Sequence, residues 1–329
     1  MSKKYNIAIV GASGLVGRTM ANVLDEHNFP ISEIKFLTSK NSAGKPLIFQ
    51  NREYIFEELT ENSFDNCDIA LFSAGGSISK IFAPIAAKTG CVVIDNSSYW
   101  RMDKNVPLVV PEVNPDDLKK HNGIIANPNC STIQLVVALK PIEARFGLKR
   151  VVCSTYQSIS GAGQKGVNKL LSELSGVKNS DKYQIAQNIM FHQFEDNGFT
   201  QEENKMINET RKIMHLDSLP VAMTCVRLPV LGGHSESVNL ELKKPFTIEE
   251  IRETLENSEG IILIDNPNED EYPTPKLTDG KDEVFVGRIR KDNSVENGLY
   301  LWVVADNLRK GAATNAVQIA EKMIEMNLL

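Results

Sequence analysis

The sequence has few cysteines, and their spacing does not favour cross-linking. The five are far apart and include no C-x-x-C pair: Cys67, Cys91, Cys130, Cys153 and Cys225. Disulfide frameworks and structural zinc sites need paired or closely spaced cysteines, so the sequence predicts neither. We therefore expect a reducing, cytoplasmic compartment and no bound metal.

Basic tracts and long apolar runs are also missing. Lys and Arg total 36 against 42 Asp and Glu, which gives a formal net charge of -6. Without a run of positive charge that could follow a phosphate backbone, nucleic-acid binding is disfavoured. No apolar stretch approaches the ~18 residues of a membrane helix, so no membrane partner is expected. The apolar run after Lys4 stops at Gly11 with no small-residue cleavage pattern, and we interpret it as a first strand.

What the sequence does contain is typical of a globular protein with about two domains. Its 329 residues are 42% apolar and 24% charged, with no internal repeat or low-complexity segment. Short apolar strands alternate with helical patterns in the first part of the chain. This alternation predicts an α/β domain over residues 1–127, with a Rossmann-type doubly wound parallel sheet. The expected strands are Ile7–Val10, Ile34–Leu37, Ile69–Phe72 and Cys91–Ile94, with helices from the Gly11–Gly17 loop to Glu26 and over Ser77–Lys88.

After Asn127 the pattern changes to longer strands, which predicts an α+β domain with a mixed or antiparallel sheet over residues 128–308. Its first helix, Ser131–Arg145, should kink or break at Pro141. The last helix, Lys310–Met326, lies in a segment, 309–329, expected to pack back on the N-terminal domain. The other expected elements are strands Val151–Gln157, Ala222–Leu228, Val238–Leu242, Glu283–Ile289 and Leu299–Ala305, and helices Lys165–Ser175, Thr200–His215 and Thr247–Leu255.

A glycine loop follows the first strand. Gly11, Gly14 and Gly17 would let the backbone approach a pyrophosphate closely at a helix N-terminus, whose free N–H groups attract anions. The spacing G-x-x-G-x-x-G departs from the usual dinucleotide fingerprint, so a tight turn without a ligand is the alternative. The end of the second strand, Phe36–Lys45, has no carboxylate for ribose hydroxyls and offers hydroxyl, amide and ammonium donors. It favours NADP over NAD, unless it is an ordinary polar loop.

Cys130 is placed at the start of a helix by the sequence Asn127–Thr132. A helix N-terminus stabilises the thiolate and lowers the cysteine pKa, which favours a nucleophile. The other four cysteines lie in apolar runs or beside Asp68 and are expected to be buried small hydrophobes. A cysteine nucleophile needs a base, and a base titrating near neutrality would suit the role. His234 follows a strand and two glycines, in a predicted loop that could present it to a cleft.

Ten ordered segments of the chain resemble the aspartate-β-semialdehyde dehydrogenase family, over essentially the whole length. They are Gly11–Gly17, Ser39–Lys45, Ser73–Gly76, Asp95–Met102, Val110–Asn114, Asn127–Thr132, Tyr156–Gly163, Glu202–Lys205, Arg227–His234 and Asp306–Ala313. The resemblance implies the reversible, NADP-dependent conversion of aspartate semialdehyde and phosphate to aspartyl phosphate. The biosynthetic direction supplies lysine, by way of diaminopimelate, threonine and methionine. The resemblance also implies a thioester intermediate on the cysteine.

The resemblance further implies roles for individual residues. Cys130 would be the nucleophile, His234 the acid and base, and Gln157 would orient the substrate. The implied substrate ligands are Arg227 for the carboxylate, Glu202 for the ammonium group, and Arg101 and Lys205 for phosphate. The implied cofactor contacts are Gly11, Ser13, Gly14, Leu15, Val16, Ser39, Asn41, Ser42, Ser73, Gly75, Ser160, Gly161 and Asn307. A homodimer or homotetramer is implied, with the sheet of the second domain as interface.

The sequence departs from the family at Asn41, where many relatives carry arginine, and Gly232-Gly233 should make the loop before His234 more flexible than in relatives with a bulkier residue there. One alternative within the enzymes is N-acetyl-γ-glutamyl-phosphate reductase, whose cysteine usually has glycine before it and tyrosine after it, unlike Asn129 and Ser131. Glyceraldehyde-3-phosphate dehydrogenase differs in its glycine loop, cysteine context and cofactor loop. The alternative from another class is a non-catalytic NADPH-binding regulator, in which Cys130 and His234 would be incidental.

Overall fold

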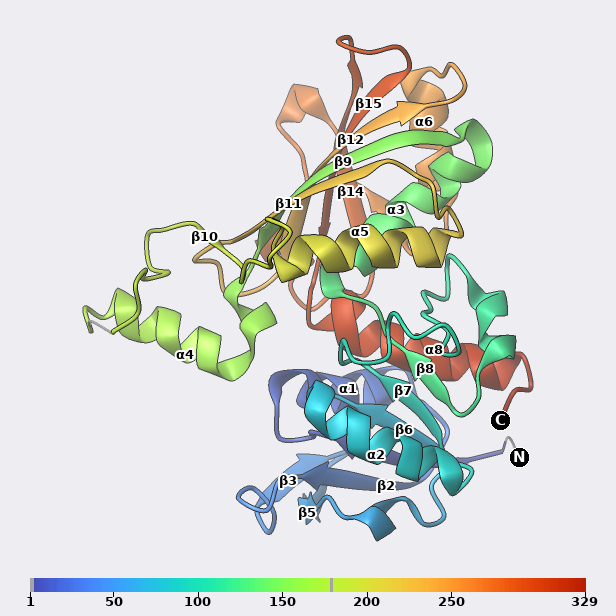
Figure 1. Ribbon diagram of the computed structural model, residues 1–329, viewed down its shortest axis with the longest axis vertical. Coiled ribbons are helices and arrows are strands. Elements are labelled where there is room, and N and C mark those ends of the chain that lie inside the picture. Colours follow the sequence, from blue (N-terminus) through green and yellow to red (C-terminus); the bar gives the residue numbers. More distant parts are fainter. Residues whose placement is uncertain (1–2, 178–179) are drawn as a thin grey trace. The chain divides into compact units, whose positions relative to one another are not determined.

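The chain divides into two compact units in the computed structural model, which describes residues 3–177 and 180–329. The first unit contains the chain up to Asn129 together with Ala312–Leu329. The second unit contains Cys130–Gly311. Figure 1 follows the chain by colour through both units.

The first unit is built on a six-stranded sheet in the order β5-β2-β1-β6-β7-β8. Every pairing within it is parallel. Strands β6 and β7 are buried at every position, on both faces, as a parallel sheet covered by helices requires. The predicted Rossmann-type sheet is therefore confirmed. Its strands are β1 (Tyr5–Val10), β2 (Ile31–Thr38), β5 (Glu57–Glu58), β6 (Ile69–Phe72), β7 (Val92–Asp95) and β8 (Ile124–Ala126).

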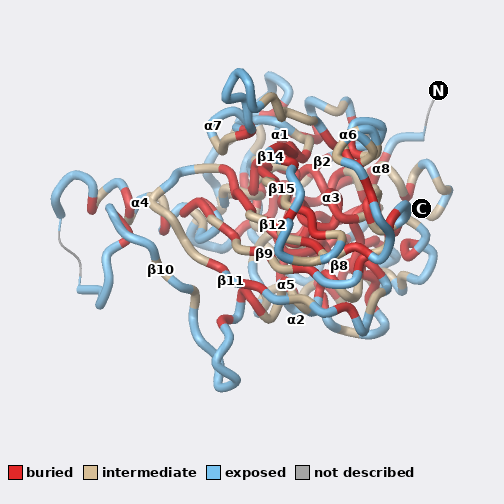
Figure 2. The backbone as a smooth tube through the Cα atoms, turned by 90° about the horizontal axis from the view of Figure 1, so that it is seen from above, coloured by how far each residue is buried: buried red, intermediate tan, exposed pale blue. Residues whose placement is uncertain are grey.

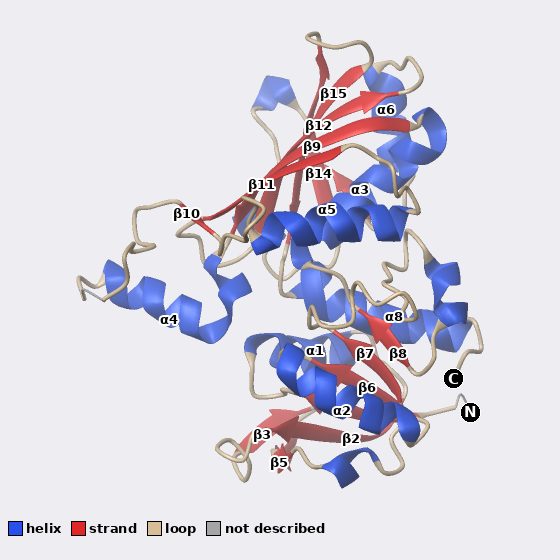
Figure 3. Ribbon diagram, in the orientation of Figure 1, coloured by secondary structure: helices blue, strands red, loops and turns tan. Residues whose placement is uncertain are grey.

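Three α-helices accompany this sheet, namely α1 (Leu15–Glu26), α2 (Gly76–Lys88) and α8 (Thr314–Glu325) (Figure 3). The C-terminal helix α8 packs on α1, and its buried side chains join the same apolar core as strand β1. It returns to the N-terminal unit as expected. The preceding turn, Arg309–Ala313, is π-helical, so the helix expected from Lys310 has its regular part only from Thr314.

The sequence did not reveal a hairpin in the first unit, formed by β3 (Pro46–Phe49) and β4 (Arg52–Ile55). Its strands are short and largely exposed, so they show little of the alternation that marks a half-buried strand. The hairpin is held by edge-to-face contacts among the rings of Phe36, Phe49 and Tyr54. Two short 3₁₀ helices complete the unit, at Glu61–Phe64 and Pro115–Lys120.

The second unit is built on a seven-stranded sheet in the order β10-β11-β9-β12-β15-β14-β13. Two pairings are parallel, β11 with β9 and β13 with β14, and the other four are antiparallel. The prediction of a mixed sheet is confirmed. The strands are β9 (Leu148–Gln157), β10 (Met190–Phe191), β11 (Val221–Arg227), β12 (His234–Leu242), β13 (Ile261–Leu263), β14 (Val284–Asp292) and β15 (Gly298–Ala305).

Helix α3 (Cys130–Phe146) packs on four of these strands and is buried along most of its length (Figure 2). It continues through Pro141, where a kink or break was expected, to Phe146. A proline removes one backbone hydrogen bond, and the packing of α3 on the sheet and on helix α5 (Gln201–Met214) outweighs that loss. The other helices are α4 (Gly163–Leu174), α5 (Gln201–Met214), α6 (Ile248–Glu256) and α7 (Pro275–Thr278), with 3₁₀ turns at Ile159–Ala162 and Pro267–Glu269.

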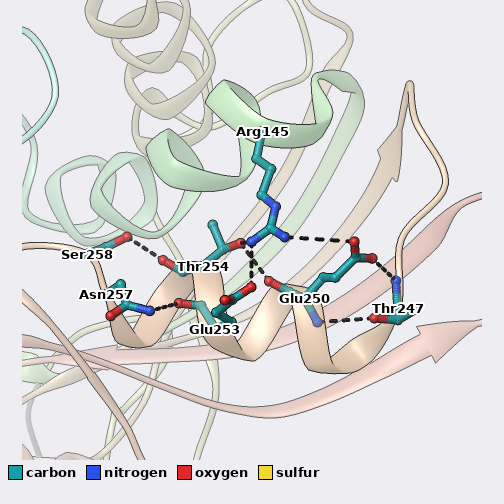
Figure 4. Close-up of polar contacts among 7 residues, drawn as sticks. All are labelled: Arg145, Thr247, Glu250, Glu253, Thr254, Asn257 and Ser258. Atoms are coloured by element: carbon teal, nitrogen blue, oxygen red, sulfur yellow. Dashed lines mark hydrogen bonds and ion pairs between the residues drawn. The ribbon is translucent and has the colours of Figure 1, made fainter.

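A polar cluster links the end of α3 to the exposed start of α6 (Figure 4). Arg145 lies 2.9 Å from a Glu253 carboxylate oxygen and donates to the Thr254 hydroxyl. The Thr247 hydroxyl accepts from the Glu250 backbone N–H while the Glu250 carboxylate accepts from the Thr247 N–H, which is a capping box. This explains why α6 begins where it does.

One expectation about a site residue is wrong. His234 does not lie in a loop; it is the first residue of β12, paired with Gln157 on one side and Ala305 on the other. The turn before it is closed by Gly233, whose φ of +75° suits glycine and whose Cα faces Pro275. Among the described residues, no helix is both long and apolar enough to cross a membrane.

Candidate active site

Three predicted site residues form one row across the sheet of the second unit. Gln157 at the end of β9 pairs with Arg227 on β11 and with His234 on β12. Residues directly opposite one another on neighbouring strands place their side chains on the same face. The row Arg227–Gln157–His234, here called the first row, therefore presents a guanidinium, an amide and an imidazole side by side.

Cys130 is the first residue of α3, as the sequence predicted, and is partly exposed. The other four cysteines are buried, also as predicted. Helix α3 is tied to the first row by a 2.8 Å hydrogen bond from the Gln157 side-chain amide to the Ser131 hydroxyl. Burial lowers the pKa of Arg227, and the ionised forms of Cys130 and Glu202 would partly offset this, so both side chains lie near the guanidinium.

The protonation of His234 follows from its contacts. The ring is fully buried, and its Nδ1 accepts a hydrogen bond from the Ser158 backbone N–H at 3.0 Å. Since Nδ1 is an acceptor, the proton of the neutral imidazole sits on Nε2. Nε2 has no hydrogen-bond partner within the described residues. Burial, and then the charge of Arg227, lower the pKa of His234 to about 3, so it is neutral at physiological pH rather than titrating near neutrality.

Gly161 keeps open the space in front of these groups. A Cβ at this position would lie 2.7 Å from Nη1 of Arg227 and 3.3 Å from Nε2 of His234. Its φ does not require glycine, so the constraint comes from space. Arg227 Nη1 is in turn fixed by donating to the Ser158 carbonyl at 2.6 Å.

The predicted cofactor residues Ser160 and Asn307 are buried together beside His234. Oδ1 of Asn307 accepts from the hydroxyls of Ser158 and Ser160 and from the Gly233 backbone N–H, at 2.9, 3.1 and 3.0 Å. Ser158 and Gly233 are the residues that contact or precede His234. Asn307 thus braces the two backbone segments that hold the imidazole.

Helix α5 supplies the predicted substrate ligands Glu202 and Lys205. Their charged atoms are 3.1 Å apart, and the second Glu202 oxygen accepts from the Gln157 amide at 3.2 Å. Glu202 is buried and Lys205 is partly exposed. The helix begins with a capping box between Thr200 and Glu203, which sets the position of its first turn. Both residues therefore approach the first row from one side of the helix.

His192 was given no role from the sequence, yet it lies in this neighbourhood. With Arg227 it lines a cavity of about 220 Å³ that is otherwise mostly apolar. Burial, and then the charge of Arg227, lower the pKa of His192 to about 4, and its Nε2 has no hydrogen-bond partner among the described residues. The short strand β10 before it carries no recognisable motif, so only the fold reveals its position.

In the first unit, a cavity of about 370 Å³ lies at the glycine loop. It is lined by five of the predicted cofactor residues: Gly11, Ser13, Gly14, Ser39 and Ser73. A Cβ at Gly11, whose φ is +83°, would lie 2.7 Å from the Ser73 carbonyl oxygen. No side chain caps the N-terminus of α1, so its backbone N–H groups remain available to an anion. These features fit the pyrophosphate of a dinucleotide.

The other cofactor residues predicted in the first unit do not line this cavity. Among the described residues that line it, Lys40 and Glu58 appear, whereas Leu15, Val16, Asn41, Ser42 and Gly75 do not. Glu58 reaches the site because β5 pairs in parallel with the end of β2, opposite Thr38. The sequence pattern missed this carboxylate because it follows Thr38 by 20 positions along the chain.

Arg101 belongs to the first unit, unlike the other predicted substrate ligands. Its guanidinium is buried and donates to the carbonyl oxygens of Asn127 and Asn96 at 3.0 and 2.9 Å. These bonds fix the side chain against the segment that leads to α3.

The chain matches two protein-family models, "Semialdehyde dehydrogenase, NAD binding domain" over residues 6–121 and "Semialdehyde dehydrogenase, dimerisation domain" over residues 139–310. It is 57% identical to the aspartate-semialdehyde dehydrogenase of Aquifex aeolicus, with 99% of each chain covered. It resembles the solved structure of Vibrio cholerae aspartate semialdehyde dehydrogenase II complexed with ASA (TM-score 0.94, 47% identity, 98% and 99% covered). It also resembles the Candida albicans enzyme with NADP (TM-score 0.78, 25% identity, 99% and 100% covered).

Proposed function

The chain belongs to the semialdehyde dehydrogenase family, and we propose that it catalyses the reversible, NADP-dependent reductive dephosphorylation of L-4-aspartyl phosphate to L-aspartate 4-semialdehyde. The full-length similarity to aspartate-semialdehyde dehydrogenases gives the substrate. The observation that carries the chemistry is the first row, Arg227–Gln157–His234, beside the helix that begins at Cys130. Together they provide an anion ligand, an orienting amide, a base and a nucleophile.

Cys130 acts as the nucleophile. Its thiolate adds to the acyl carbon of aspartyl phosphate, a C–S bond forms, and the C–O bond to phosphate breaks to leave a thioester and inorganic phosphate. Reduction of the thioester carbon and cleavage of the C–S bond then give the aldehyde and restore the thiolate. Its place at the N-terminus of α3 supports this role, because the helix dipole stabilises the thiolate.

His234 transfers the protons. With the proton on Nε2 it donates to the oxygen that gains charge on the attacked carbon, and in the oxidative direction the same atom accepts a proton from the thiohemiacetal hydroxyl. The hydrogen bond from Ser158 to Nδ1 supports this assignment, since it directs the exchangeable position to Nε2. Gln157 orients the carbonyl through its amide, which is itself positioned by Ser131 and Glu202.

The charged residues bind the two ends of the substrate. Arg227 offers its planar fork to the α-carboxylate, a geometry that lysine does not reproduce. Glu202 accepts the α-ammonium group, and Lys205 binds phosphate. Arg101, in the first unit, is assigned to phosphate on the family resemblance alone. The partial burial of these groups supports the proposal, because charge-assisted contacts are stronger where water is excluded.

When bound, NADPH would supply the hydride in the reductive direction, and NADP+ would accept it in the oxidative direction. Gly11, Ser13, Gly14, Ser39 and Ser73 would hold its phosphate and ribose groups, as the cavity at the glycine loop supports. We extend the proposal to contacts from Leu15, Val16, Asn41, Ser42, Gly75, Ser160, Gly161 and Asn307. Lys40 joins this set because it lines the cavity, which Asn41 does not.

The match to a dimerisation domain supports an oligomer, and we propose a homodimer or a homotetramer formed through the sheet of the second unit. The domain roles proposed are dinucleotide binding for residues 1–127, catalysis and dimerisation for 128–308, and a returning helix for 309–329. We further propose that the protein acts in the cytoplasm, in the synthesis of lysine, threonine and methionine.

One assay tests the function. Purified protein should form NADPH from aspartate semialdehyde only when phosphate is present, and the variant Cys130→Ala should lose this activity while keeping its fold and its NADPH affinity. Cys153→Ala is the matched control, because Cys153 is buried in β9 among the cysteines given no chemical role. Turnover of the N-acetylglutamyl substrate in place of aspartate semialdehyde would contradict the substrate, and full activity of Cys130→Ala would contradict the covalent mechanism.

A further inference from the structure

A second row of side chains lies directly behind the first row on the same face of the sheet. Two residues further along each strand, Thr155 of β9 pairs with Cys225 of β11 and with Glu236 of β12, and Glu236 pairs with Val303 of β15. Side chains two positions apart on a strand share a face. Glu236 therefore stands next to His234 on the same strand and the same face, and it has no part in the mechanism above.

Glu236 is completely buried, and no positively charged side chain among the described residues offsets a negative charge on it. Neither carboxylate oxygen has a hydrogen-bond partner within the described residues. The titratable groups that face it are Cys153 and Cys225, on which its charge acts in the same direction as burial, raising the pKa of each. Burial raises the pKa of the Glu236 carboxyl well above its usual range, and the nearby Gln134 amide offsets only part of the rise.

Gln134 lies beside Glu236 and contacts strand β12, and it belongs to the helix that begins at Cys130. It lies one helical turn after Cys130 on α3, where side chains four positions apart share a face. Its amide nitrogen donates to the backbone carbonyl of His234 at 3.3 Å. The other end of the amide, Oε1, is buried without a donor, like the two oxygens of Glu236. A single proton on Glu236 would turn one of these three acceptors into a donor for Gln134.

We propose that Glu236 is a positioning residue that remains an uncharged carboxylic acid and, through Gln134, sets His234 relative to the helix that carries Cys130. The carboxylic O–H donates to Oε1 of Gln134, and Nε2 of Gln134 donates to the His234 carbonyl. With both ends of the amide hydrogen-bonded, Gln134 fixes the position of strand β12 relative to the first turns of α3. An ionised Glu236 would leave Oε1 without a donor and add a negative charge beside the imidazole.

The inference rests on the proposed role of His234, and isosteric variants test it. Glu236→Gln keeps a donor in an uncharged side chain, so kcat should stay within about threefold and the pH profile of kcat should be unchanged. Glu236→Leu removes the donor, and kcat should fall by about ten- to a hundredfold, with the KM values for both substrates changing little, because misplacement affects the reacting geometry. The matched control is Thr155→Val, an isosteric loss of a polar group from the same row, which should leave kcat intact.

If Glu236→Leu folds poorly, two other measurements still test the proposal: the kinetics of Gln134 variants and infrared spectroscopy of the carboxyl group. Gln134→Leu should lower kcat as Glu236→Leu does, and the double variant should be no slower than either single variant, because both changes break one connection. An infrared difference spectrum between the unaltered chain and Glu236→Gln should show the band of a protonated carboxylic acid. A carboxylate band instead, a shifted pH profile in Glu236→Gln, or unchanged kcat in Gln134→Leu would overturn the proposal.

The outcome for Glu236 is separable from that of the proposed function. If His234→Asn loses kcat while Glu236→Leu and Gln134→Leu keep it, only the positioning role fails. If His234→Asn keeps both kcat and its pH profile, the acid–base role of His234 fails, and the positioning role fails with it.

Discussion

The imidazole Nδ1 of His234 accepts a hydrogen bond from the backbone N–H of Ser158, with 3.0 Å between the two nitrogens. A backbone N–H cannot become an acceptor, so this contact excludes a proton on Nδ1 and disfavours the imidazolium. The contact and the burial of the ring together make His234 a neutral base with its proton at Nε2. This relationship determines how the protein should respond to pH.

The stability of the second unit should fall as the solution becomes more acidic. The pKa of His234 is about 3 in the folded chain and about 6.5 when unfolded, so the unfolded chain binds more protons between these values. The contribution of His234 to the free energy of unfolding should therefore be fully present above pH 6.5. It should decrease as the pH falls, by about 2 kcal/mol at pH 5. Urea titrations at pH 7 and pH 5 measure the difference.

His234→Asn provides the comparison for this pH dependence, because an amide does not titrate. Its unfolding free energy should change less between pH 7 and pH 5 than that of the unaltered chain. His215→Asn is the control for replacing a histidine away from the first row, since His215 follows helix α5 at an exposed position. An equal loss of stability in His234→Asn and the unaltered chain would show that His234 is not held neutral.

Gly161→Ala should lose activity while remaining folded. The added Cβ would meet Nη1 of Arg227 and Nε2 of His234. The guanidinium is the end of a flexible side chain, so it can move away while the fold is kept, at the cost of its hydrogen bond to the Ser158 carbonyl. Moving it misplaces the proposed carboxylate ligand, so kcat/KM should fall by about a hundredfold with the melting temperature little changed. Gly232→Ala is the matched control, since its Cβ has only Asp279 near, at 4.0 Å. Equal activity of the two variants would contradict the argument.

Two capping boxes allow a comparison of stability with function. Thr200→Ala and Thr247→Ala each remove a hydroxyl that caps a helix, and each should cost about 1 kcal/mol of unfolding free energy. Only α5 carries Glu202, so only Thr200→Ala should also raise the KM for aspartate semialdehyde, by about tenfold. Urea titration and steady-state kinetics measure the two effects. A raised KM in Thr247→Ala would contradict this prediction, because it would show that a loss of stability alone raises the KM.

Cofactor choice should depend on Lys40 and Glu58, which line the cavity at the glycine loop with opposite charges. Lys40→Ala should weaken NADPH binding by roughly tenfold and NADH binding much less, because only NADPH carries the 2′-phosphate. Glu58→Gln should strengthen NADPH binding, since it removes a repulsive carboxylate. Fluorescence titrations give the dissociation constants, and Lys45→Ala, which does not line this cavity, is the control. Equal losses for both cofactors in Lys40→Ala would refute this role.

The helices and central strands could be predicted because their signals are local. Strand β6 is apolar at all four positions between polar segments, and its predicted bounds coincide with those observed. Cys130 begins α3 as expected, because Pro128 disfavours helix before it and a continuous apolar pattern follows. The β3–β4 hairpin was missed because exposed strands carry no such pattern. His234 was placed in a loop because two glycines precede it, whereas strand pairing begins directly after Gly233.

The sequence by itself determined the alternation of strands and helices, the glycine loop, the position of Cys130 and, through its resemblance, the candidate residues. Only the tertiary structure decided that Gln157 lies between Arg227 and His234, that Glu58 enters the cofactor cavity, and that Glu236 is buried behind the imidazole. The physical reason is strand register. The register depends on how whole faces of the sheet bury their side chains, and a one-residue shift would send every side chain of a strand to the other face.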